Sequence, residues 1–130
     1  MTVRRMTLTA SLVIAMLGLG AAPALAAPSA GCFLSANWNG WKSPSPSVIY
    51  LRVNARDIYR VDLSTPSTTL SDPDVHLVNV LRGSDWVCTP LDLQLHVVDD
   101  FGTFREPLIV KSITRLTPEE AEAIPAKFRP

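Results

Sequence analysis

Two histidines, His76 and His96, lie near aspartates in the sequence and are the first residues to consider for chemistry. Zinc needs three or four ligands that converge at about 2 Å, and its sites usually show short His or Cys spacings. No such spacing is present here. We therefore interpret both histidines as ordinary strand residues, and we expect neither a metal ion nor a cofactor. The neighbouring carboxylates belong to Asp72, Asp74, Asp99 and Asp100.

Those carboxylates and one serine are the remaining candidates for catalysis. Asp99 and Asp100 precede Gly102, which is typical of a solvated turn, and neither aspartate pair has the alternating oxygen ligands of a calcium loop. Gly83-Ser84-Asp85 lacks the G-x-S-x-G pattern of a strained nucleophile turn. We expect no catalytic residue, although a triad can also be assembled from distant segments.

Tryptophan and arginine dominate binding hot spots, so they are candidates for contact with a partner. Trp38 and Trp41 lie near Cys32 in the sequence, and Trp86 lies close to Cys88. A bridge between the cysteines would bring the three rings towards one another. The rings then either pack over the bridge as part of the core or stay exposed and anchor a partner. The candidate partner-binding residues are Trp38, Trp41, Trp86, Arg52 and Arg60.

Residues 1–26 have the three parts of a secretory signal peptide. Arg4 and Arg5 form the basic start, an apolar run covers 8–19, and Ala24-Leu25-Ala26 is an A-x-A cleavage site. Cleavage after Ala26 would leave residues 27–130 as one exported domain, with the periplasm as the expected compartment. No second apolar segment of membrane-spanning length follows, so we expect no transmembrane segment in the mature chain.

The charge balance argues against a nucleic-acid partner. The chain has 12 Lys and Arg against 12 Asp and Glu, and the signal peptide removes Arg4 and Arg5. The resulting slightly acidic, interspersed balance lacks the basic patch that nucleic acids require. We therefore expect a protein or another component of the cell envelope as the partner.

The chain has two cysteines, Cys32 and Cys88. Two cysteines in a small exported domain usually pair, so a disulfide between them is predicted. The alternatives are two free buried thiols, a bridge to another protein, or a lipid anchor at Cys32, which follows the small residues Ser29-Ala30-Gly31.

Alternating and β-branched residues predict several short strands after an irregular start at 27–47. Within that start, the Pro- and Ser-rich segment 42–47 cannot be a central strand. A broken face pattern near Lys111-Ser112 indicates a bulge or an edge in the last strand. The predicted strands are 48–53, 58–63, 75–81, 86–88, 91–98 and 104–116.

The first two of these strands form a predicted hairpin whose register follows from its apolar faces. Placing both apolar sets on one face requires an odd loop, such as Ala55-Arg56-Asp57. Val53 would then lie opposite Tyr59, and Leu51 opposite Val61.

A short helix is predicted near the C-terminus. Thr117 can cap it, Pro118 suits its first position, and Glu120 completes a capping box. Together with the strands, this helix indicates a mainly β fold for 48–130, a small antiparallel barrel or sandwich with a short C-terminal helix.

Several short motifs occur in a characteristic order and spacing along the mature chain. They are Cys32-Phe33, Gly40-Trp41, Asp57-x-Tyr59-Arg60-x-Asp62-Leu63, Trp86-x-Cys88 and Ile113-x-Arg115-Leu116-Thr117-Pro118-Glu119-Glu120. In these motifs the chain resembles an uncharacterised family of small exported proteins from Gram-negative bacteria, a domain of unknown function. The resemblance implies an envelope location and a paired Cys32–Cys88, and it brings no activity, cofactor or catalytic residue.

These observations favour a non-catalytic binding or accessory module of the cell envelope. One alternative is an inhibitor of a lysozyme- or protease-type hydrolase, a role that suits a small disulfide-closed β domain. The other is a small enzyme or metal-binding protein.

Overall fold

The structure is a computed structural model that describes residues 31–130. The predicted signal peptide, 1–26, lies outside the described residues. The strands are β1 (Phe33–Leu34), β2 (Trp38–Ser45), β3 (Val48–Val53), β4 (Asp57–Leu63), β5 (Val75–Asn79), β6 (Trp86–Val87), β7 (Leu95–Asp99), β8 (Arg105–Pro107) and β9 (Val110–Arg115). One α-helix, α1 (Pro118–Ala123), and four 3₁₀ turns, η1 (Ser35–Asn37), η2 (Thr68–Ser71), η3 (Pro90–Asp92) and η4 (Ala126–Phe128), complete the described part.

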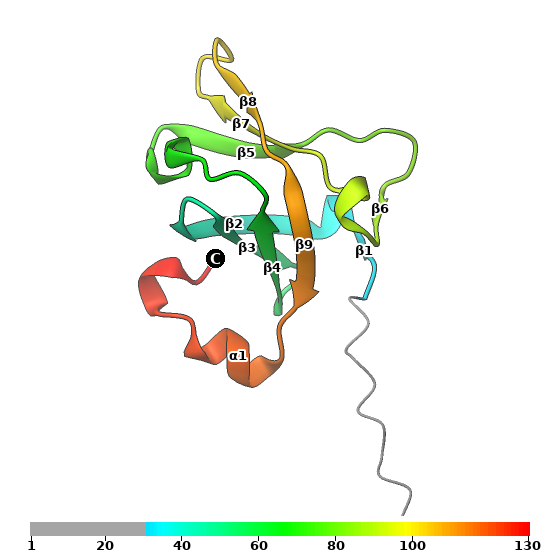
Figure 1. The fold of residues 1–130 in the computed structure, drawn as a ribbon. Coiled ribbons are helices and arrows are strands. Elements are labelled where there is room, and N and C mark those ends of the chain that lie inside the picture. The colour runs from blue at the N-terminus through cyan, green and yellow to red at the C-terminus, as the bar shows by residue number, and fades with distance from the viewer. Residues whose placement is uncertain (1–30) are drawn as a thin grey trace, which may run out of the picture.

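The strands form three antiparallel sheets, which confirms the predicted mainly β fold (Figure 1). The largest has the order β2-β3-β4-β9, the second is β5-β7-β8, and β1 pairs with β6. The sheets do not close into a barrel and pack in a sandwich-like arrangement.

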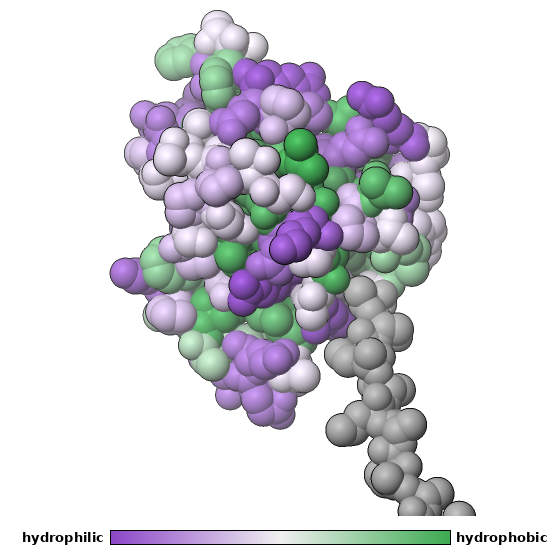
Figure 2. All heavy atoms as spheres, in the orientation of Figure 1, coloured by the Kyte–Doolittle hydropathy of each residue, from purple (hydrophilic) through white to green (hydrophobic). Residues whose placement is uncertain are grey.

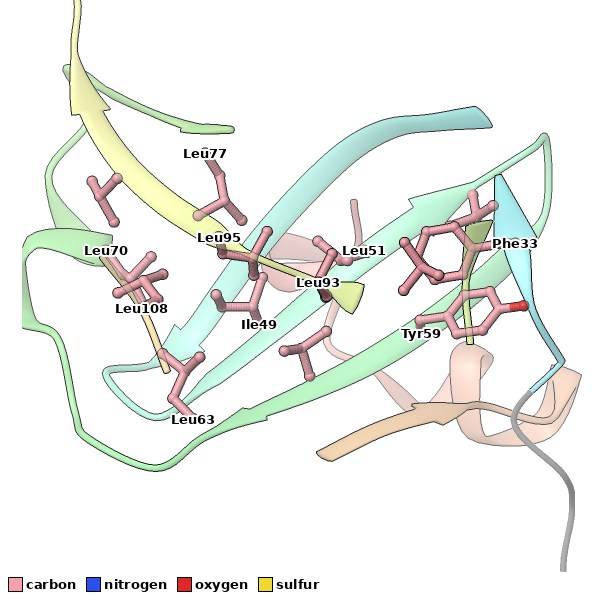
Figure 3. Close-up of a cluster of buried hydrophobic side chains, with 14 of the residues drawn as sticks. Phe33, Ile49, Leu51, Tyr59, Leu63, Leu70, Leu77, Leu93, Leu95 and Leu108 are labelled. Atoms are coloured by element: carbon pink, nitrogen blue, oxygen red, sulfur yellow. The ribbon is translucent and has the colours of Figure 1, made fainter. Parts of the chain in front are cut away.

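The core lies between the inner faces of the two larger sheets (Figure 3). Ile49, Leu51 and Val53 alternate with outward-facing residues along β3 and are fully buried. From the other sheet, Leu95 and Val97 point inward from β7, as their alternation with Gln94 and His96 predicts. Each side chain of this kind stabilises the fold by about 1.5–3 kcal/mol through removal from water.

The hairpin of β3 and β4 has the predicted faces but not the predicted register. Val53 lies opposite Asp57 and Leu51 opposite Tyr59, so the predicted pairs are wrong by two residues. The loop has the required odd length, but it consists of Asn54, Ala55 and Arg56. The reason is Asn54, whose φ of 54° starts the turn one residue earlier, because asparagine tolerates the left-handed conformation.

The segment 27–47, predicted to be irregular, contains the eight-residue strand β2, and the prediction is wrong there. β2 is an edge strand, with register shifts between Trp38 and Gly40 and between Lys42 and Ser45. A proline is tolerated at an edge because its missing N–H faces away from the ladder. The prediction that the Pro- and Ser-rich segment 42–47 cannot be a central strand is correct, because β2 lies at an edge of the sheet. The prediction did not consider an edge strand.

The last predicted strand is two strands, β8 and β9, which belong to different sheets. The chain passes from one sheet to the other at Leu108 and Ile109. Ser112 pairs with Asp62 and Val110 with Leu63, so Lys111 has no partner on β4. This register shift at the edge strand β9 confirms the irregularity predicted near Lys111-Ser112.

The disulfide between Cys32 and Cys88 is present, as predicted. Phe33 lies opposite Val87 in the β1–β6 pair, so the cysteines next to them face each other with their Cα atoms 4.3 Å apart. Phe33 also contacts Tyr59, with ring centroids 4.7 Å apart, and this contact joins the small sheet to the core (Figure 3).

The C-terminal segment covers part of the outer face of the four-stranded sheet. The predicted capping box holds α1, because Thr117 Oγ1 accepts from the Glu120 amide and the Glu120 carboxylate accepts from the Thr117 amide. Ile58 points to this outer face and is only 6% exposed. The amide of Leu116 donates to the Ile58 carbonyl oxygen at 2.9 Å, which ties the start of the segment to β4.

Candidate functional site

The five residues predicted to bind a partner do not form one site. Trp38 and Trp41 lie on β2 of the four-stranded sheet, whereas Trp86 lies on β6 of the small sheet. Arg52 and Arg60 point away from the core on β3 and β4.

The three tryptophans divide between the two roles considered for them. Trp38 and Trp41 are half-buried and pack against the core, and Trp38 Nε1 donates to the carbonyl oxygen of Gly40 at 2.8 Å. Trp41 also lines a small hollow of about 440 Å³ together with Phe128. Trp86 is 51% exposed.

The two arginines also differ. Arg60 forms an ion pair with Asp62 at 2.8 Å on the exposed surface. Arg52 lies over Gly40, where a Cβ atom would come within 3.2 Å of its guanidinium. Its Nε donates to Asn39 Oδ1 at 2.7 Å, and its Nη1 donates to the carbonyl oxygen of Pro130 at 3.3 Å. Arg52 therefore joins β2 and β3 to the C-terminal segment.

Arg52 lines a groove of about 800 Å³, which is larger than the hollow beside Trp41 and which we call the arginine groove. The groove lies between the β3–β4 turn, the end of β9 and α1. Hydrophobic and hydrophilic side chains lie next to each other at this end of the molecule (Figure 2). Its lining comprises Arg52, Ala55, Arg56, Asp57, Ile58, Arg115, Leu116, Thr117, Pro118, Ala121, Glu122, Arg129 and Pro130.

The lining contains a set of apolar residues that come from separate elements. Ile58 is buried on β4, while Leu116 and Ala121 are half-buried at the start of the C-terminal segment and on α1. Because these positions are apolar, a ligand in the groove can bury apolar surface there.

The charged side chains that line the groove are unequal in number, with four arginines against two carboxylates, those of Asp57 and Glu122. Asp57 accepts from Asn54 Nδ2 at 3.1 Å and from Arg115 Nη2 at 2.5 Å. These two contacts, the asparagine first, lower the pKa of the Asp57 carboxyl, and the carboxylate raises the pKa of Arg115 in return.

The remaining arginines of the groove keep donors free for a ligand. Arg129 Nη2 donates to the carbonyl oxygens of Glu122 and Ile124, which hold it against the end of α1. Within residues 31–130, the exposed Arg56 side chain has no hydrogen-bond partner. A guanidinium with free N–H groups beside an apolar surface is suited to bind a carboxylate attached to an apolar group.

A second exposed feature is the turn between β7 and β8, residues 99–104, which we call the hairpin tip. It projects from the end of the molecule opposite α1 (Figure 1). Phe101 is 89% exposed and Phe104 is 43% exposed. Hydrophobic side chains appear at this end in the space-filling view (Figure 2).

The hairpin tip is held by hydrogen bonds to one aspartate. The Asp99 carboxylate accepts from Thr103 Oγ1 at 2.5 Å and from the Phe104 amide at 3.0 Å, and its carbonyl oxygen accepts from the Gly102 amide. The bonds to the carboxylate, that from Thr103 first and then that from the Phe104 amide, lower the pKa of Asp99. Gly102 has a φ of 68°, a conformation that glycine adopts without strain.

The histidines and aspartates considered for a metal site are not clustered as one. His76 Nε2 lies 2.5 Å from Asp100 Oδ1 at the surface, while His96 pairs with Pro107 and Val78 inside the second sheet. Among residues 31–130, no three His, Cys, Asp or Glu side chains are placed to share a metal ion.

Comparison of the chain with protein-family models, with curated proteins and with solved structures finds no match. The resemblance to a family of exported Gram-negative proteins therefore stays a prediction. In the part of the chain that the structure describes, no helix has the length and apolar character to cross a membrane.

Sequence reasoning found Arg52 but missed Ile58, Arg115 and Arg129 as parts of one groove. One signal was available in the sequence. Ile58 is an apolar residue at an outward-facing position of β4, and such a residue needs a covering element. The apolar positions Leu116, Ala121 and Ile124 in the C-terminal segment could have identified that element.

Proposed function

We propose that this protein is a non-catalytic binding module of the cell envelope that holds an acidic segment of another protein in the arginine groove. The observation that carries the proposal is the groove itself, with four arginines against two carboxylates beside an apolar surface. Export is supported by the signal-peptide pattern of residues 1–26, and the disulfide is compatible with an oxidising compartment.

The groove favours a segment that carries both carboxylates and an apolar side chain. Guanidinium groups bind carboxylates through paired N–H donors, and such charge-assisted bonds are about twice as strong as neutral ones. The half-buried apolar residues Leu116 and Ala121 would lose contact with water when an apolar side chain covers them. A volume of about 800 Å³ lies within the usual range of ligand pockets.

The test is a titration of the isotope-labelled protein with an acidic peptide that contains Asp, Glu and Phe, followed by NMR. We expect the largest amide shifts at Ile58, Arg115 and Ala121. Arg56→Glu should weaken binding about tenfold or more, because a lost charge-assisted hydrogen bond costs about 1.5–3 kcal/mol.

Arg82→Glu is the matched control, since Arg82 is exposed and does not line the groove. It makes the same change in net charge and should leave the affinity nearly unchanged. An equal loss in both variants would indicate attraction by overall charge alone. Shifts confined to residues outside the groove would contradict the proposal.

Inhibition of a lysozyme- or protease-type hydrolase is the second candidate. The projecting hairpin tip, with Phe101 almost fully exposed, is the observation in its favour, because such a turn could enter a cleft. The groove ranks first because it combines charge with an apolar surface, whereas the tip has no concave surface of its own. A small enzyme or a metal-binding protein stays a prediction without a site to support it.

A further inference from the structure

We propose that the acidic segment held in the arginine groove is the hairpin tip of a second copy of this chain, so that molecules join head to tail. This inference rests on the proposed function, because it names the occupant of the same groove. Four features of the molecule support this pairing: the charges, the apolar groups, the ordered backbone of the tip and the positions of the two surfaces.

The charges of the two surfaces are complementary. At the hairpin tip, Asp99 and Asp100 lie next to Asp74, because Val75 pairs with Asp99 across the sheet. Arg105 is the basic residue that follows the tip. The tip and its neighbours Asp74 and Arg105 together carry three aspartates against one arginine, whereas the side chains of the groove include four arginines against two carboxylates. Complementary potentials of this kind guide two proteins into one orientation.

The apolar groups are also complementary. The hairpin tip exposes the rings of Phe101 and Phe104, and the groove offers the half-buried side chains of Leu116 and Ala121. A buried aromatic side chain removes about 150–250 Å² from water, and such residues act as anchors at interfaces. The tip thus has the carboxylates and the apolar rings that the groove is suited to bind.

The hairpin tip is already ordered before it binds. Asp99 accepts three hydrogen bonds within the turn, and His76 contacts Asp100 from the neighbouring strand. Binding therefore requires little further ordering of the backbone, which lowers the entropic cost of association.

The two surfaces lie at opposite ends of the molecule, since the β7–β8 turn and α1 are at opposite ends of the fold (Figure 1). A contact between different surfaces of identical chains is heterologous, and it continues into an open chain unless a rotation closes a ring. Contacts limited to one turn and one groove bury less area than a stable interface does. We therefore expect weak, reversible and salt-sensitive association that does not stop at a dimer.

The test uses two variants, each with one surface disabled, and analytical ultracentrifugation. Phe101→Ser disables the hairpin tip and leaves the groove intact. Arg56→Glu disables the groove and leaves the tip intact. Both side chains are exposed, so neither change should disturb the fold. We expect the average mass of the wild type to rise steadily with concentration, and each variant alone to associate at least tenfold more weakly.

Mixing the two variants provides the decisive measurement. Only one contact, between the tip of the Arg56→Glu variant and the groove of the Phe101→Ser variant, remains possible. We expect a one-to-one dimer that does not grow further. A mixture that remains monomeric, or a wild type that remains monomeric at about millimolar concentration, would overturn the inference. Variants that associate as strongly as the wild type would also overturn it, since the contact would then lie elsewhere.

The outcome also separates this inference from the proposed function. If the mixture stays monomeric while the acidic peptide still shifts Ile58 and Arg115 in an Arg56-dependent way, the groove binds a different protein. If neither the mixture nor the peptide shows binding, both proposals fail together.

Discussion

Asp57 is a carboxylate of the arginine groove that is paired with an arginine of the same groove. It accepts from the Asn54 amide and from the Arg115 guanidinium, and it lies at the start of β4 beside the turn. Both contacts favour the charged carboxylate and lower its pKa. The same residue therefore helps to set the turn and holds Arg115 at the edge of the groove.

The lowered pKa of Asp57 predicts a loss of stability in acid. Because the folded state holds the charged form more firmly than the unfolded state does, the contribution is complete above the ordinary pKa of aspartate, about 3.9. It is lost as the pH falls through the lower folded-state value. An exposed pair contributes about 1 kcal/mol or less, so the Tm advantage over Asp57→Asn should be a few degrees at pH 7 and vanish in strong acid.

An NMR titration of the Asp57 carboxyl group provides the direct measurement. Asn54→Gly is the matched variant, because glycine keeps the left-handed turn and removes only the amide contact. The pKa of Asp57 should move towards the ordinary value in this variant. A wild-type Asp57 that already titrates like a free aspartate would show that the two contacts do not form in solution.

Single residues were predicted from the sequence with mixed success. Leu93, Leu95 and Val97 are buried as their alternation indicates, and Cys32 pairs with Cys88. The roles of the tryptophans could not be predicted, because exposure depends on which sheet each residue joins. Trp38 and Trp41 pack against the core from an edge strand, while Trp86 faces outward from the small sheet.

Among the elements, the pair of β1 and β6 depends most on a covalent bond. Each strand has two residues, and isolated two-stranded pairs are marginal in water. The disulfide joins the chain directly outside both strands. It also keeps Phe33 against Tyr59, so the bridge supports one end of the core.

Replacing both cysteines by serine should lower the free energy of unfolding by about 4 kcal/mol, judged from the loop-closure entropy of a 56-residue separation. Chemical denaturation of the wild type and the Cys32→Ser, Cys88→Ser variant measures the difference. Reductant should destabilise the wild type and leave the variant unaffected. If the wild type denatures at the same midpoint with and without reductant, the bridge contributes nothing to stability.

Elements of the fold could be predicted from the sequence where the local sequence pattern is strong. The hairpin of β3 and β4, the bulge near Lys111 and the capping box at Thr117 all have local signals, and all three are present. β2 was missed because its pairing with β3 is a tertiary contact that overrides the low strand propensity of its Pro and Ser residues. The hairpin register was missed by two residues because it depends on the φ of Asn54.

At the scale of the whole molecule, the three sheets share one apolar core. Phe33 of the small sheet, Leu51 of the four-stranded sheet and Leu95 of the second sheet belong to the same buried cluster. A single core without independent parts favours unfolding in one cooperative step.

We therefore expect thermal unfolding measured by tryptophan fluorescence and by far-UV circular dichroism to have the same midpoint. The fluorescence reports on Trp38 and Trp41 in one sheet and on Trp86 in another, whereas the dichroism reports on all strands. Midpoints that differ by more than about 5 °C would mean that the small sheet opens separately.

The arginine groove itself could not be predicted from the sequence. Its arginines come from positions 52, 56, 115 and 129, and they meet only because β9 pairs with β4 and the C-terminal segment then turns back over the sheet. Pairing between distant strands leaves no local pattern. The mainly β class was predictable, since it depends on short-range alternation alone.

The position of the disulfide has a mechanical consequence. The bridge encloses β1 to β6, while β7, β8, β9 and α1 lie outside its loop. A pull on the two ends of the described chain can extend only the outer part, because the 56-residue loop stays tied at its base. At about 3.3–3.6 Å per extended residue, the bridge prevents roughly 190 Å of chain from being extended by the applied force. The maximum extended length of the described chain is therefore much shorter in the oxidised protein than in the reduced protein.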